Sequence, residues 1–200
     1  LNSDTYLIHD AIAVFHDYME QAAHQHVACC GAELLYPDGK EQMSFGNFPS
    51  VLEAFSNLGF FLLYKDYYEK HIRAGVFNYS PAIKKVDYIT GADMFLRKSV
   101  LDEVGAFDPD FFMYFEETEL SFRIKKAGYD IMLLPAARIV HLEGASQDKS
   151  AYFNYRKIEM LSTSRNLYFQ KCHGKAVALL IKAVYIFRSL VMYCLKKKKG

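Results

Sequence analysis

An apolar run, HVACCGAELLY at residues 26–36, constrains the fold of this 200-residue chain more than any other segment. It ends at Pro37-Asp38-Gly39-Lys40, a strong turn sequence, and therefore predicts a buried β-strand. Further strands are predicted in VDYIT (86–90), YDIMLLP (129–135) and ARIVHL (137–142). The sheet of such a chain lies largely inside the protein, so helices have to cover it.

Helical patterns alternate with these strands. Apolar positions between residues 8 and 22 recur at helical spacing, and Asp10 could assist the start of that helix. A capping box beginning at Ser99 predicts a short helix that stops at Gly105. The acidic cluster at 116–119 opens another helix, which Gly128 closes. Residues 44–80 are predicted to form a loop with short helices. The alternation of strands and helices along the chain indicates the α/β class.

Charge and cysteine content exclude several classes of function. The net charge of +1 gives no global field that would attract nucleic acid, so no nucleic-acid partner is expected. The four cysteines, Cys29, Cys30, Cys172 and Cys194, have no CxxC spacing and predict neither a zinc knuckle nor a redox motif. They are typical of reduced thiols in the cytoplasm, and Cys29 and Cys30 are expected to point to opposite faces of a strand.

The stretch from residue 171 to the C-terminus has a different character. It is strongly apolar, but Lys182 and Arg188 interrupt it and four lysines, 196–199, close it. Two cations in the middle argue against a simple transmembrane span, whereas a cationic stripe on an apolar helix suits an anionic membrane surface. A packed terminal helix with a solvated polar edge is the alternative. We therefore expect two parts: residues 1–170, and a basic amphipathic helix over 171–200.

Transfer of a sugar from a nucleoside diphosphate makes demands that one segment meets in order. The leaving diphosphate needs a cation, the acceptor hydroxyl needs a carboxylate base, and the acceptor must be held in place. The run 86–146 resembles the second half of inverting GT-A-type glycosyltransferases of family 2, especially bacterial rhamnosyltransferase-like members. The landmarks are Gly91-Ala92, Arg97, Gly105, Phe107-Asp108, Phe111-Phe112, Glu116-Glu117-Thr118-Glu119-Leu120, Arg123, Gly128-Tyr129, Pro135, His141 and Ser146.

The resemblance extends to the N-terminus and covers roughly residues 1–170. LNSDT at residues 1–5 is similar to the family's Asn-Pro-Asp-Thr variant of the Asp-x-Asp signature. Asn2 stands in place of the first Asp, so the resemblance carries only Asp4 over as a ligand of a divalent metal, Mg or Mn. His141 occupies the family's C-terminal His position, where it can complete the metal shell or touch the diphosphate.

The resemblance also assigns roles within the acidic cluster. Glu117 takes the position of the general base, with Glu in place of the more usual Asp. Glu116 would help to position donor or acceptor or orient Glu117, with a solvated role as the alternative. Glu119 is expected to support the helix start or to pair with a basic residue.

Further residues are candidates for substrate binding. Gly91 and Ala92 form a turn near the expected path of the acceptor, and Asp93 follows it directly. Arg97 and Arg123 could contact phosphates or the acceptor, while salt bridging is an equally good interpretation of both. The function of Asp93 stays open at this point.

These expectations combine into one hypothesis and one alternative. The resemblance implies a truncated GT-A, Rossmann-like mixed sheet flanked by helices, followed by the C-terminal amphipathic helix. Since LNSDT begins abruptly, we expect the nucleotide-binding strands to be missing and the isolated chain to turn over poorly. The alternative is a non-catalytic sugar- or lipid-binding module that keeps the fold.

The expected substrates and location follow from the same resemblance. The donor is a nucleoside-diphosphate sugar, with rhamnose favoured over galactofuranose or glucose, and the acceptor is a glycan or a polyprenyl-linked saccharide. The expected process is bacterial cell-surface polysaccharide synthesis. The expected location is cytoplasmic and peripheral, at the inner face of the plasma membrane.

Overall fold

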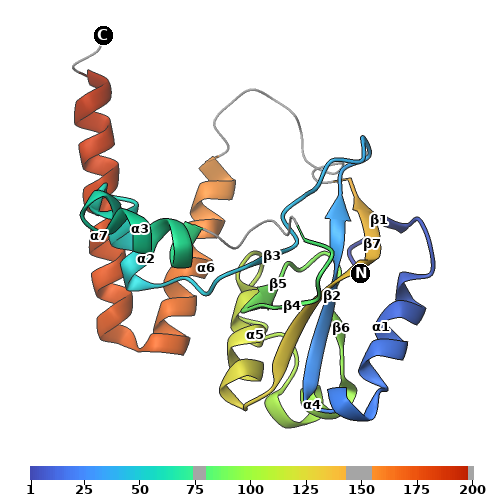
Figure 1. Ribbon diagram of the computed structural model, residues 1–200. Coiled ribbons are helices and arrows are strands. Elements are labelled where there is room, and N and C mark those ends of the chain that lie inside the picture. Colours follow the sequence, from blue (N-terminus) through green and yellow to red (C-terminus); the bar gives the residue numbers. More distant parts are fainter. Residues whose placement is uncertain (74–79, 143–154, 198–200) are drawn as a thin grey trace. The chain divides into compact units, whose positions relative to one another are not determined.

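The computed structural model describes residues 1–73, 80–142 and 155–197, which form two compact units (Figure 1). The first unit contains residues 1–48, 75–110 and 116–155. The second contains residues 49–74, 111–115 and 156–200. Ser146 and the last lysines of the basic tail, Lys198 and Lys199, lie outside the described residues.

A mixed sheet forms the first unit. Its strand order is β1-β7-β2-β6, and β4 also pairs with β7. The strands are β1 (Thr5–Leu7), β2 (Val27–Leu35), β4 (Lys84–Lys85), β6 (Phe95–Leu96) and β7 (Asp130–His141). β2 and β7 run parallel and every other pair is antiparallel. Two short strands, β3 (Phe45–Gly46) and β5 (Tyr88–Ile89), make a separate antiparallel ribbon. The expected α/β fold with a mixed sheet is confirmed.

The C-terminal part of the sheet corrects one prediction. Two strands were expected around Pro135, but β7 continues through it as one strand. The register against β2 jumps there: Ala32 pairs with Leu134, and the next residue, Glu33, pairs with Arg138. Because proline has no N–H to donate, an irregularity in the ladder at this point lets the strand continue.

Helices cover this sheet as expected, with two local differences. α1 (Ala11–Met19) is shorter than the apolar pattern suggested, because the chain forms β1 shortly before it. Asp10 Oδ1 caps this helix by accepting a hydrogen bond from the Ala13 amide at 3.0 Å. A short 3-10 turn, η1 (Ala22–His24), follows. α4 (Lys98–Val104) contains Ser99 inside the helix, so the capping box is wrong. α5 (Glu116–Lys126) begins with the acidic cluster, as predicted.

The core of this unit lies on both faces of β2. One cluster contains Phe15 of α1 together with Cys30, and the other contains Leu120 of α5 together with Cys29. The neighbouring cysteines therefore point to opposite faces, as the strand period requires. All four cysteines are free thiols, and Cys29 and Cys30 are buried. These two buried thiols fill space in the core.

The second unit is helical within the described residues. It contains α2 (Val51–Ser56), η2 (Phe60–Tyr64), α3 (Lys65–Tyr67), η3 (Tyr68–Arg73), α6 (Tyr155–His173) and α7 (Lys175–Lys197). α6 and α7 are separated by Gly174, whose φ of +89° is the left-handed conformation that glycine adopts readily. The C-terminal helix expected over 171–200 corresponds to α7, which begins only at Lys175 because α6 continues to His173.

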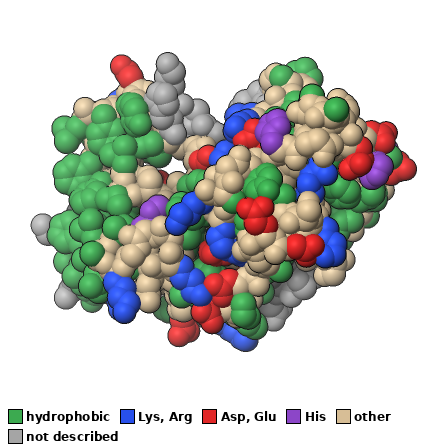
Figure 2. All heavy atoms as spheres, turned by 90° about the horizontal axis from the view of Figure 1, so that it is seen from below, with side chains coloured by type: hydrophobic (Ala, Val, Ile, Leu, Met, Phe, Trp, Pro, Cys, Tyr) green, Lys and Arg blue, Asp and Glu red, His purple; other side chains and the backbone are tan. Residues whose placement is uncertain are grey.

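α7 presents a largely apolar surface. Its segment Lys175–Cys194 has a mean hydropathy of 1.8 and only 11% of it is buried, so it is long and apolar enough to cross a membrane by length and composition. Exposed side chains include Leu179, Phe187, Leu190 and Tyr193. Figure 2 shows hydrophobic side chains gathered over the unit that contains α6 and α7, whereas acidic and basic side chains alternate over the sheet-containing unit.

A glycine in the central strand provides a test of this packing. A Cβ atom on Gly31 of β2 would lie 2.3 Å from Cγ2 of the buried Ile89, which is a severe overlap. We expect Gly31→Ala to lower the free energy of unfolding by about 1–3 kcal/mol, measured by urea denaturation. Ile89→Ala removes the overlapping atoms, so the double variant should lose less than the sum of the two single changes. Additive losses would contradict this packing.

Candidate active site

Asp4 and His141 lie together at one end of the sheet, although 136 residues separate them in the chain. β1 pairs with β7 so that Thr5 is opposite His141, and the Leu142 amide donates to the Asp4 carbonyl at 2.9 Å. This pairing places His141 Nε2 3.2 Å from Asp4 Oδ1. Both side chains are mostly buried, with 16% of each exposed. The two residues expected to bind metal are therefore neighbours.

Gln42 fixes the orientation of the histidine ring. Its Oε1 lies 2.8 Å from His141 Nδ1, and because an amide oxygen can only accept, Nδ1 carries the proton. The other ring nitrogen, Nε2, then faces the Asp4 carboxylate. Nothing in the sequence pointed to Gln42, which follows an ordinary surface turn.

The pair has the chemistry of two ligands of one cation. Asp4 Oδ1 is buried and has no hydrogen bond among the described residues, despite its closeness to Nε2. Two ligand atoms that each lie about 2.1 Å from an ion, with a ligand–ion–ligand angle of about 90°, are roughly 3 Å apart. This is close to the 3.2 Å between Asp4 Oδ1 and His141 Nε2. A carboxylate oxygen and an imidazole nitrogen both suit Mn²⁺. Within the described ranges no group of three His, Cys, Asp or Glu residues could hold a metal, so other ligands would have to complete the shell.

Glu117 lies in the first turn of α5, beside Gly91. A methyl group on Gly91 would lie 3.8 Å from Glu117 Cβ, so the turn at 91–92 contacts this side chain. The Thr118 hydroxyl donates to Glu117 Oε1 at 3.0 Å. Burial raises the pKa of Glu117 to about 7, and the neighbouring charge of Glu116 raises it further in the same direction. A carboxylate with a pKa near neutrality is well suited to accept a proton.

The other acidic residues of the cluster have distinct environments. Glu116 Oε2 is buried and has no hydrogen bond within the described part of the chain. Glu119 is almost completely buried and forms a two-oxygen ion pair with Arg123, with Nε 2.8 Å from Oε1 and Nη2 2.8 Å from Oε2. Pairing of Glu119 with a basic residue was one of the expected alternatives. Only Glu116 and Glu117 retain carboxylate oxygens that could act on a substrate.

The two arginines expected near the substrate are engaged elsewhere. Arg123 also donates to the carbonyls of Gly105 and Ala106, at 3.0 and 2.7 Å, and so ties α5 to the end of α4. Arg97 donates to the carbonyls of Met19 and Val27, at 2.6 and 3.1 Å. Arg97 Nη1 also lies 3.6 Å from Glu20 Oε1, so both arginines form ion pairs within the protein, as the salt-bridging interpretation expects.

The position of Arg97 also separates it from the Asp4–His141 pair. Its amide donates to the Ala28 carbonyl near the start of β2, whereas the Gln42 amide donates to Leu34 near the end of that strand. Six residues of extended strand span roughly 20 Å. Neither Arg97 nor Arg123 is included in the site proposed below.

Asp93 is a buried residue in the bend between the Gly91-Ala92 turn and β6. It accepts from the Ala32 amide through Oδ2, and its Oδ1 has no hydrogen bond among the described residues. Burial raises its pKa to about 7. The adjacent Ala92 carbonyl accepts from the Asn2 amide at 2.8 Å, so the segment 91–93 lies between Glu117 and the N-terminal strand. Asp93 thus ties the turn to the backbone of β2 and is closed off from solvent.

The backbone that leads into α5 is strained. Tyr114 and Phe115 have φ values of 66° and 68°, a left-handed conformation that costs roughly 1–2 kcal/mol per residue. The rings of Phe115 and Tyr168 pack at a tilt with their centroids 5.6 Å apart, and the Ser164 hydroxyl donates to the Met113 carbonyl at 2.7 Å. Strain of this kind persists where surrounding contacts hold it, and Glu116 follows directly.

Comparison with known proteins gives the family. Residues 1–160 match glycosyltransferase like family 2. The chain is 34% identical over 61 residues to N-acetylglucosaminyl-diphospho-decaprenol L-rhamnosyltransferase of Mycobacterium tuberculosis, over 30% of this chain and 20% of that protein. It is 28% identical over 87 residues to the low-salt glycan biosynthesis hexosyltransferase Agl10 of Haloferax volcanii, over 41% of this chain and 28% of that protein.

The matched segments therefore span less than a third of these relatives. A crystal structure of GalNAc-T7 with UDP, GalNAc and Mn²⁺ is also similar, over 70% of this chain and 27% of that protein. The TM-score is 0.43 and the sequence identity is 12%. The family match covers most of the chain, including the acidic cluster and both members of the Asp4–His141 pair. The chain is a member of glycosyltransferase family 2.

Proposed function

We propose that this chain forms the acceptor side and the catalytic base of an inverting, nucleotide-sugar-dependent glycosyltransferase, with Glu117 as the base. The observation that carries the proposal is the environment of Glu117. It is a partly buried carboxylate beside the Gly91 turn, with its pKa raised to about 7 and no cation paired with it among the described residues. Such a group can take the proton of an acceptor hydroxyl as that oxygen attacks the sugar.

A single carboxylate base implies a single displacement. The hydroxyl oxygen forms a bond to the anomeric carbon while the bond to the diphosphate breaks, and its proton passes to Glu117. The nucleoside diphosphate leaves from the opposite face, so the configuration of the sugar inverts. Glu116 would keep the pKa of Glu117 high by its charge and help to orient it.

The leaving diphosphate would be held by a divalent metal at Asp4 and His141. When bound, Mg²⁺ or Mn²⁺ supplies the positive charge that stabilises the departing phosphate oxygens. The chain's own residues hold the two ligands in place: the β1–β7 ladder positions both and Gln42 orients the imidazole. The Gly91-Ala92 turn, supported by Asp93, would border the acceptor.

The similarity to a rhamnosyltransferase supports a rhamnose donor and a lipid-linked acceptor as the first candidates for assay. The apolar surface of α7, interrupted by Lys182 and Arg188, supports attachment to the inner membrane surface. Both features fit an enzyme of cell-surface polysaccharide synthesis that works on a polyprenyl-linked saccharide.

The base assignment predicts the effect of a conservative change. Glu117→Gln keeps the size of the side chain but cannot accept a proton, so kcat in the full-length protein should fall about 10²–10⁴-fold with KM for the donor little changed. The measurement is release of nucleoside diphosphate from a panel of sugar donors with a polyprenyl-linked acceptor.

Glu103→Gln, an exposed carboxylate on α4 with the same charge change, is the matched control and should retain activity. Activity of Glu117→Gln within about threefold of the unmodified protein would sink the assignment of this residue as the base.

The metal proposal predicts binding that depends on both ligands. Mn²⁺ titration followed by electron paramagnetic resonance of the free ion should show one site, weakened about 10–100-fold by Asp4→Asn or by His141→Gln. Asp17→Asn, a change of the same type at a side chain that is 81% exposed, should leave the affinity unchanged. Absence of Mn²⁺ binding, or equal losses in all three variants, would instead favour a non-catalytic module that keeps the fold.

A further inference from the structure

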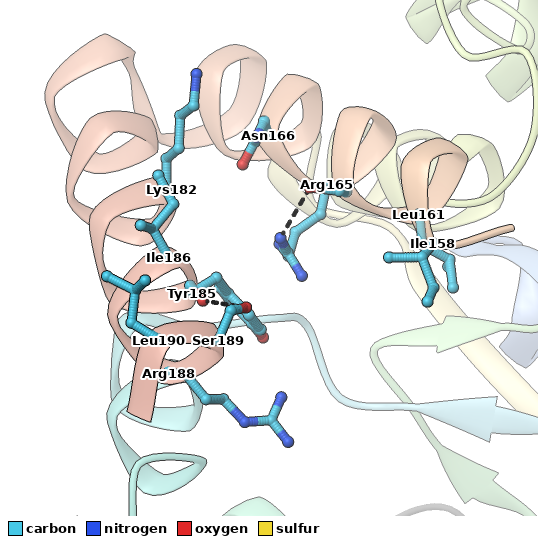
Figure 3. Close-up of a pocket in the computed structure, with 11 residues that line it drawn as sticks. Ile158, Leu161, Arg165, Asn166, Lys182, Tyr185, Ile186, Arg188, Ser189 and Leu190 are labelled. Atoms are coloured by element: carbon cyan, nitrogen blue, oxygen red, sulfur yellow. Dashed lines mark hydrogen bonds between the residues drawn. The ribbon is translucent and has the colours of Figure 1, made fainter. Parts of the chain in front are cut away.

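The two long C-terminal helices enclose a pocket with an unusual lining. It has a volume of about 520 Å³ and lies between α6 and α7 (Figure 3). Its cations are Arg165 from α6 and Lys182 and Arg188 from α7, and its apolar side chains include Ile158, Leu161 and Ile186. No carboxylate is among the described residues that line it.

None of the three cations is paired with a carboxylate among the described residues, although Arg165 Nη2 donates to Ser162 Oγ at 3.3 Å. Lys182 and Arg188 have no ion pair with any side chain in the described ranges. The Arg165 guanidinium lies 3.5 Å from the centre of the Tyr185 ring, and its Nε is buried without a hydrogen bond in the part of the chain described. Burial lowers the pKa of Arg165; the Tyr185 side chain partly offsets this, and the positive charge of Arg188 adds to the lowering. A bound anion would relieve this unfavourable arrangement.

The arrangement of the cations indicates which anion fits. Figure 3 shows Arg165 reaching from α6 towards Tyr185 between Lys182 and Arg188 on the facing helix. Lys182 and Arg188 are six residues apart on α7, about 9 Å along the helix axis. A diphosphate, which carries more than one negative charge, balances three cations better than a single phosphodiester, which carries one.

The apolar surroundings indicate what the anion is attached to. The pocket opens beside the exposed apolar surface of α7, and Ile186 and Leu190 are 52% and 59% exposed. An acyl or isoprenoid chain could follow that surface while its charged end enters between the helices. A soluble diphosphate would leave this surface in water.

We propose that the α6–α7 pocket binds the diphosphate headgroup of a membrane lipid, with Arg165, Lys182 and Arg188 as its cationic contacts. The pocket holds the phosphates and the apolar surface of α7 holds the start of the lipid chain. This inference rests on the proposed function in one respect: a lipid-linked acceptor of the transferase would carry such a headgroup.

The test is flotation of the 200-residue chain with three kinds of vesicle. One is neutral phosphatidylcholine, and the others carry either a polyprenyl diphosphate or phosphatidylglycerol at equal total charge. The chain should bind the polyprenyl diphosphate vesicles most tightly. Because Lys182 and Arg188 would contact the phosphates directly, and loss of each charge-assisted contact costs about tenfold, the double variant Lys182→Gln, Arg188→Gln should bind them about 100-fold more weakly.

A matched control separates the pocket from diffuse attraction. Arg156 and Lys175 are exposed cations on the same two helices that do not line the pocket. Arg156→Gln, Lys175→Gln removes the same charge and should weaken binding about threefold or less. Equal losses in both double variants would overturn the pocket, and equal binding of phosphatidylglycerol and diphosphate vesicles would overturn the choice of headgroup.

The experiment uses no sugar donor and no turnover. Failure of specific diphosphate binding therefore refutes the pocket while leaving the role of Glu117 intact. Loss of that role in the rate assay would leave the vesicle result unaffected.

Discussion

The parallel pairing of β2 with β7 is the interaction on which the sheet-containing unit depends. β7 is bordered by β2 on one side and by β1 and β4 on the other, so its backbone hydrogen bonds hold four strands in register. Both hydrophobic clusters pack on the faces of β2, one beneath α1 and one beneath α5. The same ladder brings the ends of β1 and β7 together, which is why Asp4 and His141 are neighbours. The ladder that organises the core thus also sets the positions of the paired ligands.

Much of this arrangement could be predicted from local sequence. The buried run 26–36, the helix capped by Asp10 and the acidic start of α5 each follow from patterns within a dozen residues. The continuous passage of β7 through Pro135 could not, because it depends on a jump in the β2 register. The cap of α4 was misjudged because Ser99 falls inside the helix, where Asp102 pairs with Lys98 instead.

The site shows the same division between local and long-range information. Resemblance to the family pointed to Asp4, Glu117 and His141, but no local pattern could reveal that Gln42 orients the histidine. Likewise, Arg97 and Arg123 carry the positive charge that a phosphate-binding residue needs. Only the three-dimensional contacts show that their donors are used by carbonyls and by Glu119.

The acidic cluster joins structure to chemistry because its members are held in different electrostatic states. Glu119 is neutralised by Arg123 and anchors the helix, which leaves Glu116 and Glu117 as close like charges at its first turn. Repulsion between them and burial both disfavour the ionised form of Glu117. The helix N-terminus favours negative charge in the same turn, and this limits how far the pKa rises.

The most direct measurement of the central claim is a carbon-13 NMR titration of the glutamate side-chain carboxyl groups, with Glu117 assigned from its Gln variant. The account predicts that Glu117 titrates with a pKa of about 7, and that Glu116→Gln moves this pKa downward by removing a neighbouring negative charge. A Glu117 pKa near the ordinary value of about 4.3, unchanged in Glu116→Gln, would contradict it.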